Sequence, residues 1–432
     1  MIDGGVMGTN LRDHWDRPIV AVTGIGIVTS LGIGKEDNWR KLSGGESGLH
    51  EITRFPTDGL RTRVAGTIDF IPADPLCAPA LSEEFAMVAS QEAIAEAGVG
   101  RVGDFPGPLF VAVPPVEVEW PQRIEMAAAS NSETVGYDEL IRIAATERFK
   151  PYYERFLYRG TTERLAERLG TKGSPIALST ACASGASAIQ LGVEAIQRGE
   201  CDVALSIGTD GSVNTEALIR FALLSALSTQ NDPPQGAAKP FAKNRDGFVM
   251  AEGAAALVLE NLDHARARGA KVLGIIQGCG EMADSFHRTR SSPDGKPIIG
   301  CIKNALADAG VTPDDVDYIN AHGTGTPEND RMECIGVTAV FGERVHSVPI
   351  SSNKSMIGHT LSAAGAIEAA FSLLTIRHQR IPPTINYLVP DPAIPLDVVP
   401  NAARDAKVRR AISNSFGFGG QNVCLVVGGE PN

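Results

Sequence analysis

The chain has 432 residues, of which 43% are hydrophobic and 21% charged, a balance that excludes a disordered chain and fits two or three domains or two fused halves. The formal net charge of −12 argues against nucleic-acid binding, because phosphate recognition needs a basic face. The seven scattered cysteines include no CxxC pair, which argues against a zinc site or a disulfide framework and indicates reduced cytoplasmic thiols.

The N-terminal segment, residues 1–17, is predicted to be a loose extension. It contains Asp, Arg and His and no apolar core, so it does not resemble a signal peptide. No stretch of the sequence has the roughly 18 consecutive apolar residues that a membrane-spanning helix requires. We therefore expect a cytoplasmic protein without a membrane span.

Apolar, β-branched segments predict a series of strands separated by helices. The predicted strands lie in Pro18–Gly32, Leu109–Val113, Asp202–Gly208, Ala255–Glu260, Val272–Gly278, Val316–Gly323, Val348–Lys354, Arg409–Ser415 and Val423–Gly429. The predicted helices are Phe85–Ala97, Cys182–Arg198, Pro297–Ala309 and Leu361–His378. This alternation favours an α/β protein with mostly parallel sheets covered on both faces. A charged helix at His264–Lys271 is the expected join between two halves, residues 18–266 and 267–432.

One segment differs in composition from the rest. Residues 115–172 hold four of the six tyrosines together with many charged side chains, as in ERFKPYYERFLYRGTTERLAERLG. This pattern predicts an amphipathic helical insertion or cap over the core. A partly solvated surface subdomain remains an equally good interpretation.

Cys182 lies at the sharpest local signal in the sequence. A predicted strand runs into Ser179–Ala181, and the residues after Cys182 are almost all small or apolar up to the helix stop at Gly199. A cysteine at the start of a buried helix has free N–H groups and a helix dipole that stabilise a thiolate. The strand–nucleophile–helix order resembles a nucleophile elbow. A structural, buried cysteine is the competing interpretation.

Two histidines and a lysine follow further predicted strands. His322 begins a polar, glycine-rich turn, and His359 comes five residues after Lys354, before another buried helix. A lysine among apolar helices needs an anionic partner, and Glu333 is the candidate. Taken alone, a histidine at a strand end is more often a structural residue than a functional one.

A glycine-rich loop, Asn414–Asn422, completes the set of candidate residues. Its glycines surround Phe418 and would let backbone N–H groups approach a ligand closely, although the loop could also be an ordinary turn between strands. Residues at the ends of parallel strands meet at one edge of a sheet. We therefore expect Cys182, the two histidines, the lysine and this loop to form one site.

At these residues the chain resembles the β-ketoacyl–acyl carrier protein synthases of the thiolase superfamily, in particular the type II elongating group. The resemblance covers Pro18 to Gly429. It is carried by the motifs STACASG (179–185), KPFAKNRDGFVMAEGA (239–254), NAHGTGT (320–326), NKSMIGHTLSAAGA (353–366) and NSFGFGGQN (414–422). Five long motifs in the family's order make the resemblance highly specific.

The resemblance implies a fold, a set of roles and partners. The fold would be a five-layered αβαβα sandwich of two related halves, usually a homodimer. Cys182 would accept the acyl group, and His322 and His359 would promote malonyl decarboxylation and stabilise the enolate. The remaining implied roles are an organising Lys354–Glu333 pair, an oxyanion hole from the N–H groups of Cys182 and Phe418, a gate at Phe418, pantetheine contacts from Thr324 and Thr326, and further substrate contacts from Phe416, Gly417 and Gly419.

The implied reaction is a decarboxylative condensation that yields a 3-ketoacyl chain and CO₂. It needs no metal and no cofactor beyond the phosphopantetheine of the acyl carrier protein substrates. Residues 115–172 and the bulky segment Gly211–Ser228 depart from the family pattern near the acyl tunnel. These departures favour a synthase specialised for unusually long or modified acyl chains.

Three other functions compete with fatty-acid elongation. They are a polyketide-type ketosynthase, a non-catalytic partner of the chain-length-factor kind, and a cysteine hydrolase. The presence of Cys182, His322, Lys354 and His359 disfavours the non-catalytic partner. An acidic carrier protein would dock on a basic patch. The candidate residues for this patch are Arg61, Arg63, Lys150, Arg155 and Arg220.

Overall fold

The computed structural model describes residues 11–115, 117–130 and 136–431. Most of the predicted extension, residues 1–10, lies outside the described residues. The remainder of it is tied to the body, since Arg17 Nη1 lies 2.9 Å from Asp308 Oδ1 and Leu11 N donates to Asp263. Within the described parts of the chain, no helix combines the length and the apolar character needed to cross a lipid bilayer.

The strands form two five-stranded halves that repeat one pattern. The N-terminal half runs β1–β8–β7–β5–β6, and the C-terminal half runs β9–β15–β14–β10–β11. Outward from β1 or β9, the first two pairings are antiparallel and the last two are parallel in both halves. The prediction of mostly parallel sheets is therefore wrong, because β1, β8 and β7, like β9, β15 and β14, alternate in direction. The prediction of two related halves is confirmed.

The bounds of these strands agree closely with the predicted segments. In the N-terminal half they are β1 Val20–Thr29, β5 Leu109–Ala112, β6 Ile176–Leu178, β7 Val203–Asp210 and β8 Gly253–Asn261, with β2 Gly32–Ile33 paired to β1. In the C-terminal half they are β9 Gly274–Ala283, β10 Tyr318–Asn320, β11 Ile350–Ser351, β14 Arg410–Phe416 and β15 Gln421–Gly428. The halves meet where the start of β1 pairs with the start of β9. Short β3 His50–Glu51 pairs with β4 Val64–Ala65, and β12 Arg380–Ile381 with β13 Arg404–Asp405.

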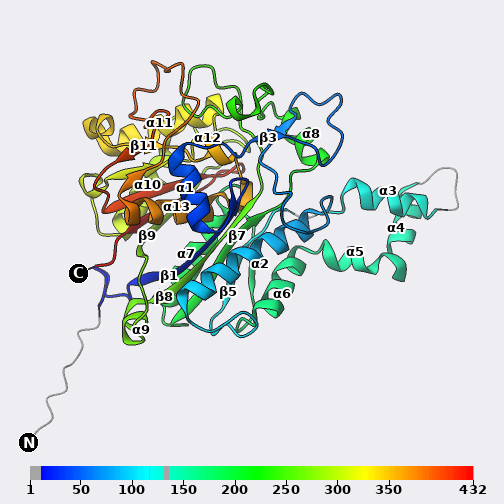
Figure 1. The fold of residues 1–432 in the computed structure, drawn as a ribbon, viewed down its shortest axis with the longest axis horizontal. Coiled ribbons are helices and arrows are strands. Elements are labelled where there is room, and N and C mark those ends of the chain that lie inside the picture. The colour runs from blue at the N-terminus through cyan, green and yellow to red at the C-terminus, as the bar shows by residue number, and fades with distance from the viewer. Residues whose placement is uncertain (1–10, 116, 131–135, 432) are drawn as a thin grey trace, which may run out of the picture.

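Helices complete a five-layered αβαβα sandwich, as predicted (Figure 1). Helix α2 (Ala78–Ala97) packs on the outer face of the N-terminal strands, and α6 (Tyr158–Leu169) packs on α2. On the other outer face α10 (Lys296–Asp308) covers β9 and β15 and contacts α11 (Pro327–Phe341). The central layer is α7 (Ser184–Gln197) against α13 (Ala364–His378). Smaller helices are α1 Lys35–Gly44, α8 Thr215–Leu223, α9 Leu262–Ala267 and α12 Lys354–Ile357.

The central helices approach closely because small residues meet at their crossing. A Cβ atom on Gly185 of α7 would lie 2.5 Å from the backbone nitrogen of Ala366, and one on Gly365 of α13 would lie 2.5 Å from the nitrogen of Ala186. Each glycine therefore faces the backbone of the other helix. This close approach brings the N-terminal ends of both helices, where the site lies, to the same place between the two halves.

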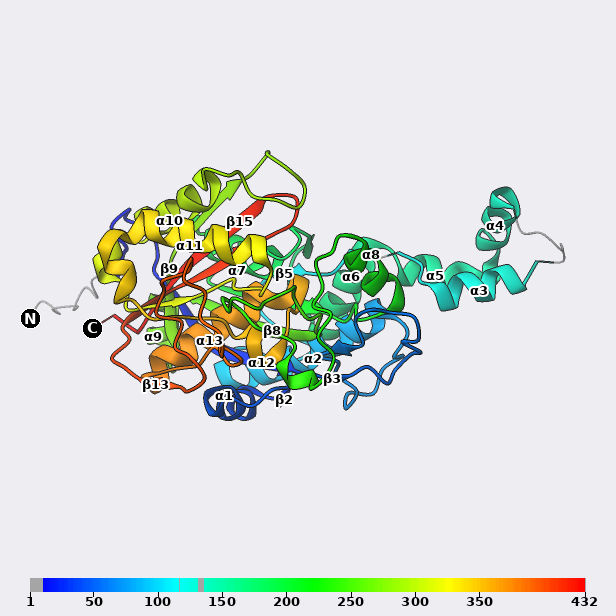
Figure 2. The same ribbon diagram turned by 90° about the horizontal axis from the view of Figure 1, so that it is seen from above.

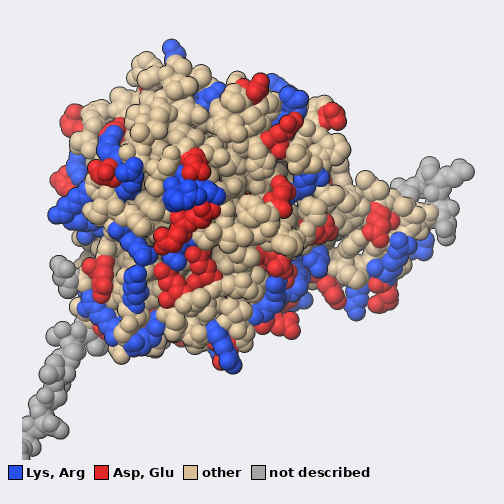
Figure 3. Space-filling model, in the orientation of Figure 1, with Lys and Arg blue, Asp and Glu red and all other residues tan. Residues whose placement is uncertain are grey.

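The aromatic insertion is helical, as predicted, and divides into two parts. Its last helix, α6, belongs to the body, where Leu165 and Leu169 join the core. Helices α3 (Trp120–Ala128), α4 (Tyr137–Ala144) and α5 (Lys150–Arg155) form an arm that projects from the body (Figures 1 and 2). Met126, Ile143 and Phe149 make a small apolar cluster inside this arm. Acidic and basic side chains lie side by side on its surface (Figure 3).

Candidate active site

Cys182 lies at a sharp turn between β6 and α7. The chain reverses at Ala181, which has a φ of 49°, a conformation that residues with a side chain rarely adopt. Ser184, the first residue of α7, holds the turn, since its Oγ accepts a hydrogen bond from Thr180 N at 2.8 Å. Cys182 therefore stands directly before the buried helix. A cysteine at a strained elbow between a strand and a helix has the geometry of a nucleophile.

His322 and His359 lie beside this sulfur. The sulfur of Cys182 and one nitrogen of each ring all lie within 4.8 Å of one another. The two rings meet edge to face, with centroids 5.3 Å apart. His322 follows β10, and His359 follows β11 and α12, so strands of the C-terminal half carry both histidines to the start of α7. Such a trio has the donor atoms of a metal site, but the same atoms are those that acyl transfer requires.

The protonation of both rings follows from their surroundings. Burial and the charge of Lys354 lower the pKa of His322 and of His359 well below the ordinary value, so both rings are neutral near pH 7. Lys354 Nζ lies 3.5 Å from Nδ1 of His322, and the backbone N–H of Leu361 donates to Nδ1 of His359 at 3.3 Å. Each Nδ1 is thus an acceptor, which leaves the ring proton on Nε2. Both histidines present an N–H donor.

The expected pairing of Lys354 with Glu333 is wrong. Lys354 forms a buried ion pair with Glu368 of α13, a residue that the sequence analysis did not identify. Glu333 instead accepts hydrogen bonds from the backbone N–H groups of His322 at 2.9 Å and Gly323 at 2.7 Å, and from Asn414 at 3.1 Å. Glu333 therefore holds the loop that carries His322, and Glu368 balances the charge of Lys354. The sequence signal that could have identified Glu368 is that it is the lone acidic residue in a mostly apolar helix.

The glycine-rich loop is the hairpin between β14 and β15, and it lies over the cysteine. The backbone N–H of Phe418 donates toward the sulfur of Cys182. A Cβ atom on Gly417 would lie 2.9 Å from the carbonyl oxygen of Thr180, so glycine is needed for this approach. Gly419 donates to Arg288 O at 2.7 Å, which ties the hairpin to the segment after β9. The loop thus brings a backbone donor to the sulfur.

Two cavities meet at the cysteine. The first, about 450 Å³, is lined by Cys182, both histidines and the predicted substrate-contacting residues Thr324, Thr326, Phe416, Gly417 and Gly419. The second, about 340 Å³, extends past Cys182 toward the starts of α2 and α8. The residues that line both cavities are Cys182, Phe221, Leu224, Leu361 and Phe418. Phe418 therefore stands in the wall between them, where a gate would lie.

The resting sulfur is a thiol. Burial raises the pKa of Cys182 to about 11, because water cannot solvate the thiolate, while the charge of Lys354 and the Phe418 N–H oppose this rise. The expectation of a stabilised thiolate is therefore not met. The thiol proton is therefore lost only as the thioester substrate is attacked, when the departing thiolate can take it up.

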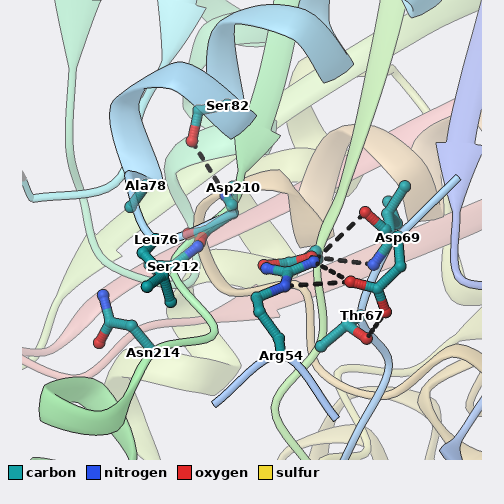
Figure 4. A network of polar contacts seen from close by, with 12 residues as sticks. Arg54, Thr67, Asp69, Leu76, Ala78, Ser82, Asp210, Ser212 and Asn214 are labelled. Atoms are coloured by element: carbon teal, nitrogen blue, oxygen red, sulfur yellow. Dashed lines mark hydrogen bonds and ion pairs between the residues drawn. The ribbon is translucent and has the colours of Figure 1, made fainter. Parts of the chain in front are cut away.

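Polar residues at the carboxyl end of β7 build the wall of the second cavity. Asp210 accepts hydrogen bonds from the backbone N–H of Ser212 at 3.0 Å and of Ser362 at 3.0 Å, which fixes this wall to the start of α13. Figure 4 shows Asp210 and Ser212 beside the start of α2, with the separate Arg54–Asp69 ion pair nearby. Of the residues labelled there, Ala78, Asp210, Ser212 and Asn214 line the second cavity.

The repeated halves, the two central helices and the Cys–His–His group at their junction define a condensing enzyme of the thiolase fold. Residues 17–265 match the N-terminal domain and residues 273–388 the C-terminal domain of beta-ketoacyl synthase. The chain belongs to the β-ketoacyl synthase family.

The relatives of this chain include both 3-oxoacyl-[acyl-carrier-protein] synthases and polyketide ketosynthases. The chain is 36% identical to the 3-oxoacyl-[acyl-carrier-protein] synthase 2 of Coxiella burnetii, over 94% of this chain and 98% of that protein. It is 37% identical to a putative polyketide beta-ketoacyl synthase 1 of Streptomyces cyaneus, over 95% of this chain and 98% of that protein. A type II polyketide ketosynthase solved with its acyl-carrier protein and bound to the hexaketide superimposes with a TM-score of 0.83, at 30% identity, over 96% of this chain and 100% of that chain.

Proposed function

We propose that the protein extends an acyl chain by decarboxylative Claisen condensation with malonyl–acyl carrier protein, releasing 3-ketoacyl–acyl carrier protein and CO₂. The observation that carries this proposal is the position of Cys182 between two cavities, with two neutral imidazoles beside its sulfur. Each cavity can hold one of the two reacting chains. Chain elongation of fatty acids, including long or modified chains, is the expected physiological setting.

In the first half-reaction the sulfur of Cys182 attacks the carbonyl carbon of an acyl thioester. The cysteine proton is transferred to the departing pantetheine thiolate as the new thioester forms. The Phe418 N–H, which already points toward the sulfur, would stabilise the oxyanion together with the N–H of Cys182. Such donors typically contribute about 3–4 kcal/mol each. The acyl group remains on Cys182, and its chain occupies the second cavity.

In the second half-reaction malonyl thioester enters the first cavity. The two Nε2–H groups donate to the thioester oxygen, which gains negative charge as the C–C bond to the carboxylate breaks and CO₂ leaves. The resulting enolate carbon attacks the acyl carbon on Cys182, and the sulfur departs as a thiolate that takes up a proton from solvent. The buried Lys354 keeps both rings neutral and His322 in the donating tautomer.

The polyketide alternative rests on sequence similarity of equal strength. The Streptomyces cyaneus polyketide relative and the Coxiella burnetii relative differ by only one percentage point in identity, at 37% and 36%. The two functions use the same condensation chemistry and differ in the chain that the second cavity would accept. The non-catalytic partner is disfavoured because the nucleophile and both histidines lie together.

We infer that the carrier protein docks at the mouth of the first cavity. Loop residues His287, Arg288 and Arg290 line that mouth and provide a basic surface for an acidic carrier. Of the residues proposed from the sequence, Arg220 is paired with Glu117, and Lys150 and Arg155 lie on the projecting arm. Reversing the charge of Arg288 and Arg290 should raise the Michaelis constant for the carrier.

We also propose that the protein is a homodimer joined through β6. This strand forms one end of the sheet and pairs only with β5 among the residues that the structure describes. Ile176 at its start is 43% exposed. An apolar edge strand invites pairing with a second copy of the chain. Light scattering should give twice the mass of the chain, and Ile176→Lys should lower it.

Intact-mass spectrometry tests the main proposal. The protein is mixed with a panel of acyl carriers, beside Cys182→Ala as the matched control. The expected result is an acyl adduct on the native chain that is absent from the variant, followed by a 3-ketoacyl carrier when malonyl carrier is added. An unmodified native chain with every carrier would contradict the proposal.

A further inference from the structure

The second cavity is apolar near the sulfur and acidic on its far wall. Its lining residues, together with Cys182, include Ala181, Phe221, Leu361 and Phe418. Three glutamates, Glu117, Glu119 and Glu216, line the same cavity from the segment before α3 and from α8. In the proposed function, on which this inference rests, this cavity holds the chain attached to the cysteine. The acids therefore face the acyl chain.

Glu119 and Glu216 are buried acids held at fixed positions. Their residues are only 6% and 8% exposed. Glu119 accepts from Asn214 Nδ2 at 2.9 Å and from the backbone N–H of Ala78, the first residue of α2, at 3.2 Å. Glu216 accepts from the backbone N–H of Trp120, the first residue of α3. Helix N-termini thus orient both carboxyl groups at the cavity wall.

Neither acid has a cationic partner among the described residues. The basic residue on the same wall, Arg220, forms its ion pair with Glu117. Burial, together with the negative charge of Glu216, raises the pKa of Glu119 to about 7. A buried carboxylate without a counter-charge is expensive unless hydrogen-bond donors surround it. The pair therefore retains acceptor capacity that the polypeptide does not use.

We propose that this carboxyl pair selects acyl chains that carry a hydrogen-bond-donating substituent, a hydroxyl or an amino group. A plain alkyl chain would displace water from the two carboxyl groups without donating a hydrogen bond, which leaves buried acceptors unpaired. A polyketone chain would set carbonyl oxygens, which only accept, against carboxylate oxygens. A hydroxyl or ammonium group donates to the pair and restores its hydrogen bonding. Sites built around such a bond discriminate strongly against analogues that lack it.

The competing explanation is purely structural. The two carboxyl groups also connect the first turns of α2, α3 and α8 through hydrogen bonds. On this explanation their role is only to stabilise the fold. A structural tie predicts altered stability with unchanged substrate preference. A recognition role predicts altered preference in a variant that still folds. The two explanations are therefore separable by kinetics.

The test measures the rate at which acyl carriers modify Cys182, followed by intact mass. The acyl chains have one length and are unsubstituted, hydroxylated, amino-substituted or methoxylated at a series of positions. We expect one hydroxyl or amino position to react at least about tenfold faster than the unsubstituted chain, while the methoxy analogue, which cannot donate, gains nothing. A hydroxyl preference identifies a neutral donor, and an amino preference identifies a cation.

Variants separate the roles of the residues. Glu216→Gln and Glu119→Gln keep the shape of the wall and should weaken the preference, and Glu216→Leu should reverse it toward the unsubstituted chain. Glu147→Gln, on the exposed surface of the arm, should leave the preference unchanged. Equal rates for all chains, or an unchanged preference in every cavity variant, would overturn the inference while the proposed condensation stands. Failure of every carrier to modify Cys182 would overturn the proposed function itself.

Discussion

At the scale of single residues, Lys354 sets the electrostatics of the active site. Its ammonium group donates to His322, keeps both imidazoles neutral and opposes the rise in the pKa of Cys182. One buried cation thus prepares the nucleophile and both donors. Its own charge is balanced by Glu368, so the reactive atoms remain free of a direct carboxylate partner.

The reactivity of Cys182 should therefore depend steeply on pH. Because its pKa is raised to about 11, the thiolate fraction should grow about tenfold for each pH unit between pH 6 and 9. Alkylation by iodoacetamide, followed by intact mass, should show this rise without a plateau. Lys354→Met removes a charge that lowers the pKa, so alkylation should be slower at each pH. A plateau near neutral pH would show that the thiolate is stabilised in the resting enzyme.

The Lys354–Glu368 pair should be strongly coupled in stability. Glu368→Gln leaves a buried ammonium unpaired and is expected to lower the free energy of unfolding by about 3–5 kcal/mol. Lys354→Met is expected to cost less, because burial already raises the pKa of Glu368 to about 7 and the carboxyl can take up a proton. The double variant should be more stable than Glu368→Gln in urea unfolding. Additive losses would contradict the coupling.

Residue identities near the chain turns were predictable, and partnerships across the fold were not. Cys182, His322 and His359 stand next to strand ends with small neighbours, which are local signals. Lys354 becomes the partner of Glu368 only through the packing of α13. In the sequence, Glu368 is visible only as an isolated acid. Glu119 and Glu216 are 97 positions apart in numbering and line one cavity only because α3 and α8 start beside it.

At the scale of elements, the crossing of α7 and α13 positions the nucleophile. Gly185→Ala would place a methyl group 2.5 Å from the backbone of Ala366, and should lower the free energy of unfolding by about 1–3 kcal/mol. Because Cys182 precedes the same helix, the acylation rate should fall as well. Gly136→Ala, where a Cβ atom meets nothing within 4 Å, is the matched control. Equal stability of the two variants would show that the helices can separate without strain.

The direction of the strands was the part of the fold that the sequence did not reveal. Residue patterns identify a buried strand such as β8. The pattern of a central strand is the same whether its neighbouring strands are parallel or antiparallel to it. The order of the strands is fixed by long connections, among them the arm between β5 and β6. Two related halves were predicted, but the correspondence between their strands became visible only when pairing direction could be compared.

At the scale of the whole molecule, buried acids should make stability depend on pH. Burial raises the pKa of Glu119, Glu252 and Glu368 to about 7 each. A carboxyl whose pKa is higher in the folded state binds more protons there, so its contribution is present at low pH and is lost as pH rises from about 4.5 to 7. Glu119→Gln cannot ionise, so its stability relative to the native chain should increase over that range, by up to about 3 kcal/mol.

Thermal unfolding at pH 5 and pH 8 checks this expectation. The difference between Glu119→Gln and the native chain should be larger at pH 8. Glu147→Gln, an exposed residue of the arm, provides the control and should show the same small difference at both pH values. A difference that shrinks as pH rises would show that Glu119 is ionised and well solvated in the folded protein.

The fixed position of the carboxyl pair has a consequence for how often one chain is extended. The growing chain is anchored at its thioester carbon, and each condensation moves every existing substituent two carbon atoms further from that anchor. A hydroxyl group that reaches Glu119 and Glu216 in one round is out of register in the next, because the wall of the cavity does not move. The enzyme would then add a single unit to such a chain and release it, so the number of rounds would be counted by position rather than limited by volume.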